Sequence, residues 1–93
     1  MLNIDSFISK NKRIPYRVIE EESILVDVDR GEVIHINEVG TEIWEFLQDK
    51  KKISNIIDHI FEIFSVEKDV LQKDALDFLE ELIKKGILVL EGH

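Results

Sequence analysis

Residues 24–37 read ILVDVDRGEVIHIN, and this stretch decides the fold of the amino-terminal half of the chain. Aliphatic residues alternate with other residues on both sides of Asp29–Gly31, which is typical of two strands joined by a tight hairpin. We expect a three-residue loop with Gly31 in the left-handed conformation. That register gives a core face made of Ile24, Val26, Ile34 and Ile36. A two-residue loop would set Val26 against His35, which packs less well.

The residues before the hairpin predict one further strand. Residues 14–19 are extended in pattern, and Pro15 suits an edge position because it has no N–H to donate. Residues 1–13 show no clear periodicity, so we expect a flexible amino-terminal arm. The folded part is then a single domain over residues 14–93.

Beyond the hairpin the apolar spacing becomes helical. Asn37 is a good N-cap for a first helix that runs to about Gln48, with Trp44 in the core. Ser54 is expected to cap a second helix. A third helix is expected from about Lys68 to Lys85, before Gly86, and residues 87–90 form an apolar tail packed on the body. The sequence predicts an α+β fold with a three-stranded antiparallel sheet followed by three helices.

Composition excludes several classes of function. The chain has 93 residues, with 12 Lys+Arg against 20 Asp+Glu and a net charge of -8, a balance that argues against a nucleic-acid partner. The absence of cysteine excludes disulfides, thiolate metal sites and cysteine nucleophiles, and it fits a cytoplasmic protein. Neither a signal peptide nor an apolar run of about 20 residues is present, so no membrane partner is expected.

Catalytic patterns are missing as well. The histidines, His35, His59 and His93, stand alone, without a second ligand at metal-binding spacing. The serines lie in no nucleophile elbow, and no glycine-rich loop is available for a phosphate. We therefore expect a protein that is not an enzyme, with no metal and no cofactor.

The unpaired edge of the predicted sheet is the better functional surface. An extended peptide can add itself to such an edge as another strand. We expect this strand to be formed by Glu32, Val33, Ile34, His35 and Ile36. If it lies beside the third helix, a shallow groove results, with apolar pockets from Leu76, Leu79 and Ile83 and polar anchors from Gln72 and Lys73. The helix carries a neighbouring apolar stripe of Leu71, Ala75, Phe78 and Leu82, and the alternative is that both stripes belong to the core.

The order of these motifs resembles the PqqD-like family over about residues 16–90. The resemblance rests on the turn ending in Gly31, on Ile36-Asn37 and Ile43-Trp44, and on the later Asp74-Ala75 and Gly86-Ile87-Leu88. The family pattern often has leucine where this chain has Ile36. The resemblance implies a winged-helix-like fold. It also implies the role of a recognition element for ribosomally synthesised and post-translationally modified peptides, in which a precursor's leader segment docks on the third strand beside the third helix.

The expected partners are a precursor leader peptide and a maturation enzyme of the same pathway. The resemblance implies that this enzyme is a radical-SAM enzyme or the leader peptidase of a lasso-peptide pathway. Two alternatives remain at this stage, a winged-helix DNA-binding regulator and a domain that forms a homodimer through its exposed edge.

Overall fold

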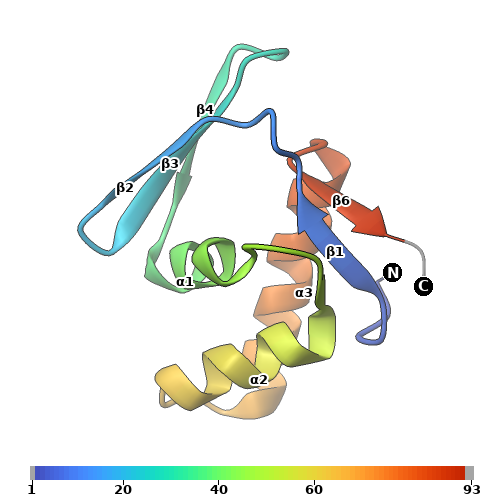
Figure 1. Ribbon diagram of the computed structural model, residues 1–93. Helices are drawn as coiled ribbons and strands as arrows, with labels where there is room; N and C mark the ends of the chain where they lie inside the picture. The colour runs from blue at the N-terminus through green and yellow to red at the C-terminus, as the bar shows by residue number, and fades with distance from the viewer. Residues whose placement is uncertain (1, 92–93) are drawn as a thin grey trace.

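The computed structural model describes residues 2–91. Its elements follow in the order β1 (Phe7–Lys10), β2 (Tyr16–Ile19), β3 (Glu22–Asp27), β4 (Glu32–Ile36), α1 (Glu38–Phe46), β5 (Lys51–Lys52), α2 (Ile53–Ile63), α3 (Lys68–Lys84) and β6 (Leu88–Glu91). Figure 1 shows β2, β3 and β4 at the upper left, and α3 behind α1 and α2. The predicted α+β class, with one three-stranded antiparallel sheet and three helices, is confirmed.

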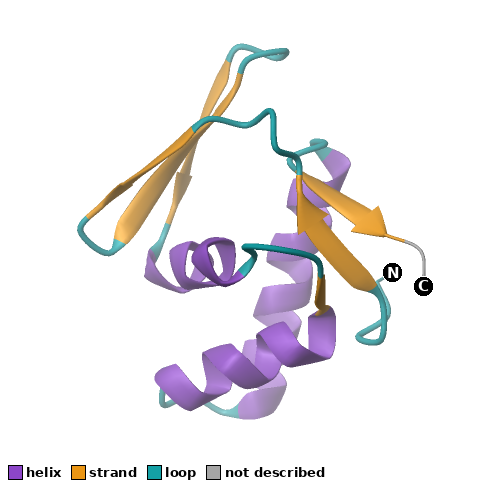
Figure 2. Ribbon diagram, in the orientation of Figure 1, coloured by secondary structure: helices purple, strands orange, loops and turns teal. Residues whose placement is uncertain are grey.

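Two small sheets flank the helices (Figure 2). The first has the strand order β2-β3-β4 and contains the predicted hairpin. The second has the order β5-β1-β6, so it joins the two ends of the described chain, and it was not predicted as a sheet. Its strands are short and lie far apart in the sequence, which leaves no local pattern to reveal them.

The predicted hairpin register is wrong by one residue. Asp27 pairs with Glu32, so the loop has four residues instead of three. Such a shift moves alternate side chains of β3 to the other face of the sheet. The buried face therefore carries Ser23, Leu25 and Asp27, whereas Ile24 and Val26 point outward. On β4 the prediction holds, because Ile36 is buried and Ile34 packs against the core.

Two polar side chains on the buried face of β3 contact partners in this register. Ser23 Oγ lies 2.7 Å from Thr41 Oγ1, so its burial does not cost a hydrogen bond. The Asp27 carboxylate accepts the Arg30 backbone N–H at 3.2 Å and also faces the Arg30 side chain, so it closes the turn. Gly31 has φ 66°, as the turn prediction required.

Asn37 caps α1 as predicted. Its Oδ1 accepts the Gly40 N–H at 2.9 Å, and its backbone carbonyl accepts the Thr41 N–H at 2.8 Å. Only Asn37 lies between the end of β4 and the start of α1, so the connection leaves little freedom in the angle between strand and helix. This cap therefore determines how the edge strand stands against the helices.

The amino-terminal segment is not a loose arm. Residues Phe7–Lys10 form β1, and the Ile8 side chain is 0% exposed. This segment also replaces the expected Ser54 cap of α2, because the Ile53 and Ser54 N–H groups donate to the carbonyls of Ser6 and Ile4. Neither the strand nor the backbone cap is visible in a sequence window, since both depend on partners far along the chain.

The core is continuous between the two sheets and the three helices. Its buried residues are Ile8, Leu25, Ile36, Ile43, Trp44, Leu47, Ile53, Ile56, Ile57, Ile60, Leu71, Ala75, Leu79, Leu82, Ile87 and Leu88. Trp44 is in the core, as expected, and meets the Tyr16 ring edge-on at 5.4 Å between centroids. The Lys10 ammonium lies 4.7 Å from each of these two ring centroids, and burial lowers the pKa of this lysine. None of the helices within residues 2–91 has the length and apolar character needed to cross a membrane.

We predict that Ile8→Ala destabilises the protein by about 2–4 kcal/mol, because the truncation leaves a cavity in a fully packed site. The matched control is Ile4→Ala, since Ile4 is 36% exposed and should cost far less. Urea unfolding followed by Trp44 fluorescence measures both. Equal and small losses for the two variants would contradict the assignment of β1 to the core.

Candidate functional site

One edge of the first sheet is open. The strand order β2-β3-β4 gives β4 a single partner, and no strand within residues 2–91 pairs with its other side. The Val26 N–H donates to the Pro15 carbonyl at 2.9 Å, so the backbone groups of Val26 point toward β2. Hydrogen-bonded and non-hydrogen-bonded pairs alternate along an antiparallel ladder. The partner of Val26 on β4, Val33, therefore makes no ladder bond to β3.

The same alternation determines the direction in which the backbone groups of every residue of β4 point. The pairs formed by Glu32, Ile34 and Ile36 are the hydrogen-bonded ones, so their backbone groups face β3. The N–H and C=O groups of Val33 and His35 point to the open edge. Their side chains are exposed on the outer face of the sheet, with Val33 58% exposed. Val33 and His35 thus each offer one N–H donor and one C=O acceptor to an added strand.

One flank of α3 faces this strand. Lys85 Nζ, at the C-cap of α3, lies 3.4 Å from Glu32 Oε1 at the start of β4. Near the end of β4 the two elements approach through Gly40 of α1, where an added Cβ would lie 2.5 Å from Ile36 Cγ2 and 2.9 Å from Phe78 Cζ. The ion pair and the Phe78 ring therefore mark the two ends of the flank of α3 that lies near β4.

The residues that were expected to form the α3 side of the site lie on a different flank from the one near β4. Asp74, Phe78 and Lys85 share the flank near β4, and Gln72, Leu76 and Ile83 come about half a turn later around the helix. Gln72, Lys73 and Leu76 line a separate hollow with Leu2 of the amino-terminal segment.

One residue of the predicted stripe belongs to the core, and the other two are half-buried and pack against it. Leu79 is 0% exposed, so it has no surface to offer a peptide. Ile83 is half-buried and packs against the core. The alternative interpretation of this stripe as core is thus correct for Leu79.

A hollow of about 230 Å³, which we call the apolar cup, lies where β4 ends. Three parts of the chain line it: α1 with the residue before it, the segment between α2 and α3, and the first half of α3. The lining residues are Asn37, Val39, Gly40, Ile43, Phe64, Val66, Val70, Leu71, Asp74, Ala75 and Phe78. The cup was not predicted from the sequence, because its lining residues come from three parts of the chain that no single sequence window contains.

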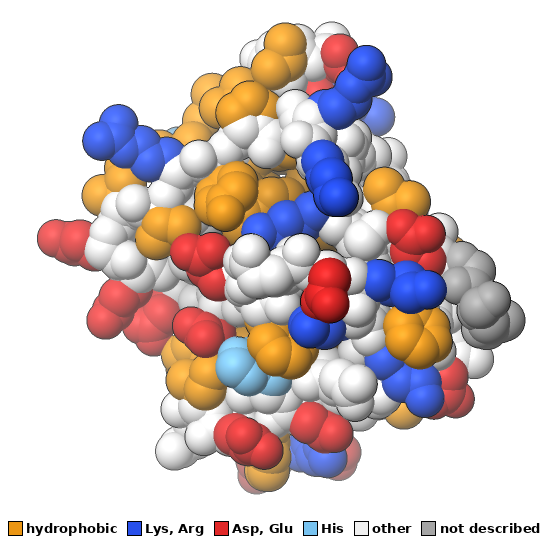
Figure 3. Space-filling view, viewed as in Figure 1, with side chains coloured by type: hydrophobic (Ala, Val, Ile, Leu, Met, Phe, Trp, Pro, Cys, Tyr) orange, Lys and Arg blue, Asp and Glu red, His pale blue; other side chains and the backbone are white. Residues whose placement is uncertain are grey.

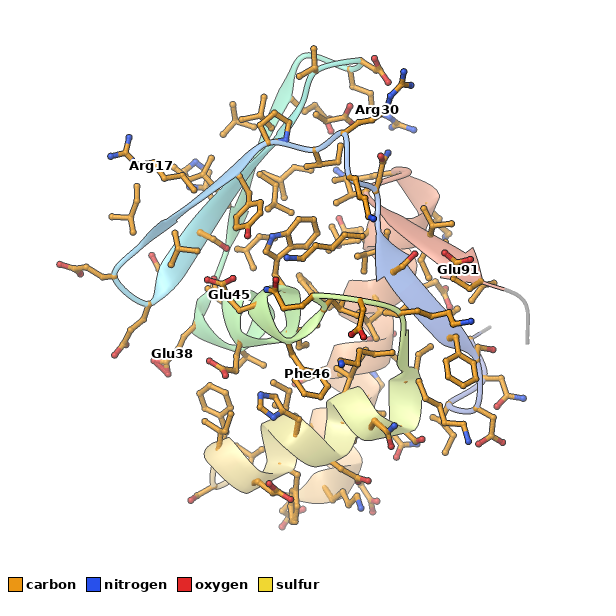
Figure 4. The ribbon with its side chains drawn as sticks, viewed as in Figure 1. Arg17, Arg30, Glu38, Glu45, Phe46 and Glu91 are labelled. Carbon is orange, nitrogen blue, oxygen red and sulfur yellow. The ribbon has the colours of Figure 1, made fainter. Side chains whose placement is uncertain are left out.

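A second hollow, next to the cup, is strongly acidic. Glu20, Glu21, Glu38, Glu42 and Glu45 line it, and Phe64 borders both hollows. Figure 3 shows the red side chains gathered at the left of the molecule, over α1 and the turn between β2 and β3. In Figure 4 the Glu38 and Glu45 side chains leave α1 on this side, while Phe46 points toward α2.

The carboxylates of this hollow repel one another. A hydrogen bond with Glu21 raises the pKa of Glu38, and the charges of Glu21, Glu22 and Glu42 act in the same direction. The hollow therefore gives a negative field beside the cup.

The histidine and carboxylate side chains of the described residues form no metal-binding cluster. Within residues 2–91 no three histidine, aspartate or glutamate side chains gather as a metal site requires. His35 lies exposed on β4, and His59 stacks on Phe46 at 4.0 Å and contacts Glu42 at 3.3 Å. The arrangement offers backbone hydrogen bonds, an apolar cup and charge, which are the elements of a binding site.

We predict that Gly40→Ala destabilises the protein by about 1–3 kcal/mol, since the new methyl group overlaps Ile36 and Phe78. Alanine normally stabilises a helix by up to about 1 kcal/mol relative to glycine, so a net loss reports the close approach. Chemical denaturation measures the change. A gain in stability would show that Phe78 does not stand against α1.

Glu38→Gln should raise the melting temperature most at neutral pH. The folded-state pKa of Glu38 is raised above its unfolded-state value. The Glu38 side chain therefore contributes to the stability of the fold at low pH, and this contribution is lost as the pH rises through the folded-state pKa. The advantage of the variant over wild type should shrink toward about pH 4. Glu62→Gln, an exposed position on α2, is the control. A difference between Glu38→Gln and wild type that stays the same at every pH would contradict the repulsion.

Comparison with known proteins agrees with this geometry. Residues 22–88 match the family described as coenzyme PQQ synthesis protein D (PqqD). A search of curated proteins finds no match. Among solved structures, the chain is similar to "TbiB1 in Complex with the TbiA(beta) Leader Peptide", with a TM-score of 0.77 and 28% sequence identity over 91% of this chain and 96% of that chain. The family match spans more than two thirds of the sequence and confirms the resemblance, so the chain belongs to the PqqD family.

Proposed function

We propose that this protein binds the leader segment of a ribosomally synthesised precursor peptide by strand addition to β4. The observation that carries the proposal is the open edge, where Val33 and His35 present backbone groups that no strand of residues 2–91 uses. A peptide bound this way becomes the fourth strand of the β2-β3-β4 sheet. The role is binding rather than catalysis.

The apolar cup at the end of β4 supports the proposal. Side chains of an added strand alternate between the two faces of the sheet. Those on the inner face meet the flank of α3 that carries Phe78 and, at the end of β4, the apolar cup. Those on the outer face lie beside Val33 and His35. Backbone bonds thus supply affinity, and the cup supplies selection among side chains.

The binding residues follow from this arrangement. We retain the predicted edge strand, in which Val33 and His35 contribute backbone groups and Glu32, Ile34 and Ile36 form its inner face. Asp74, Phe78 and Lys85 replace Gln72, Lys73, Leu76, Leu79 and Ile83 as the contacts from α3. This replacement follows from the flank of α3 that stands near β4.

The similar structure supports the ligand class. TbiB1 was solved in complex with a leader peptide, and it matches this chain over most of both lengths. We propose that this protein likewise holds a leader and presents the precursor to a maturation enzyme. A radical-SAM enzyme and a lasso-peptide leader peptidase are the two candidates for that enzyme.

Val33→Pro tests strand addition most sharply. The Val33 N–H bonds to nothing in the β2-β3-β4 ladder, and proline is tolerated on an edge strand, so the variant should fold. It should bind the leader peptide encoded beside its gene about five- to tenfold more weakly, since one backbone donor is lost. Fluorescence anisotropy with the labelled peptide measures the affinity.

The matched control for this experiment is Val33→Thr, which changes the side chain but keeps the N–H. It should bind within about twofold of wild type. Circular dichroism verifies that both variants are folded. A folded Val33→Pro variant with wild-type affinity would contradict binding at this edge.

A further inference from the structure

The apolar cup carries one charge among its lining residues, the carboxylate of Asp74. The remaining lining side chains are apolar, apart from Asn37, whose Oδ1 is occupied by the α1 cap. Asp74 is exposed and forms no hydrogen bond or ion pair within residues 2–91. The cup therefore combines apolar walls with an unpaired negative charge at its rim.

Nearby lysines do not neutralise this carboxylate. Lys73, the preceding residue, lies 3.5 Å from Asp77, and Lys68 lies 3.3 Å from Asp58 across to α2. No basic residue is among those that line the cup. A cation that reached the rim would thus find Asp74 available.

The acidic hollow reinforces this charge. It meets the cup at Phe64, and the glutamate side chains that line it give it a negative field. A positive charge at the mouth of the cup is favoured by both Asp74 and this field. An acidic side chain is disfavoured by both.

We propose that the cup receives a lysine or arginine side chain of the bound peptide. The aliphatic stem lies along Phe64, Val70 and Phe78, and the charged end reaches Asp74 at the rim. This inference rests on the proposed function and adds to it the chemical class of the residue that the peptide presents at the end of β4. A leucine or an aromatic residue would pack against the apolar walls of the cup equally well but would leave the Asp74 carboxylate unpaired.

The test selects a displayed library of random peptides on the wild-type protein. The best binder is then synthesised, and contacts to the Phe78 ring in NMR spectra locate its residue in the cup. Three versions of this peptide carry lysine, norleucine or glutamate at that position. Norleucine keeps the stem of lysine and removes its charge. Anisotropy measures each peptide against wild type, Asp74→Asn and the control Glu80→Gln, which removes a charge from the opposite flank of α3.

We expect selected peptides to carry lysine or arginine in the cup. Asp74→Asn should weaken the lysine peptide about three- to fivefold and leave the norleucine peptide unchanged, whereas Glu80→Gln should affect neither. The glutamate peptide should bind worst to wild type.

Two other results are informative. Selected peptides with leucine or an aromatic residue in the cup, and affinities indifferent to Asp74→Asn, would overturn this inference and leave strand addition intact. Binders that shift none of the amides of Val33–Asn37, or a library that yields no binder, would overturn the proposed function and this inference with it.

Discussion

The hydrogen bond from the Val26 N–H to the Pro15 carbonyl shows which backbone groups of the first sheet face the binding edge. It commits the backbone of Val26 to β2, and alternation then leaves Val33 and His35 free of β3. A slip of one residue would turn these groups inward and offer Ile34 and Ile36 in their place. The chemistry of the open edge is thus decided two strands away from it, at a proline that could not have donated a bond in return.

The second constraint is the close approach of α1 to its neighbours at Gly40. No larger residue fits between Ile36 and Phe78 without displacing them. Because Asn37 caps α1 directly after β4, this contact sets the distance between the edge strand and α3. The Glu32–Lys85 ion pair holds the far end, although an exposed pair of this kind adds little stability. The placement of the edge strand relative to α3 is therefore a consequence of packing and capping.

Much of the fold could be predicted from local patterns. The Asn37 cap, the positive φ at Gly31 and Gly86, and the three helices follow from short-range chemistry that a sequence window contains. The hairpin register could not be predicted in this way, because β3 has aliphatic residues on both faces. The register depends instead on the partners of Ser23 and Asp27. β1 and the backbone cap of α2 could not be predicted either, since their partners lie at the other end of the chain or in another element.

The candidate site was half predictable. β4 was identified as the edge strand, and the faces of Val33, Ile34, His35 and Ile36 were assigned correctly. On α3, apolar residues occur around much of the helix, so periodicity alone could not tell which flank faces β4. The sequence places Asp74 one helical turn before Phe78, and this polar residue was the available clue to the flank that lines the cup.

Amide hydrogen exchange with and without the leader peptide is the sharpest test of strand addition at β4. In the free protein the amides of Ile34 and Ile36 should be protected, and those of Val33 and His35 should exchange rapidly. Saturation with the peptide should protect Val33 and His35 while the other two change little. Rapid exchange at Val33 and His35 in the saturated complex would contradict strand addition at β4.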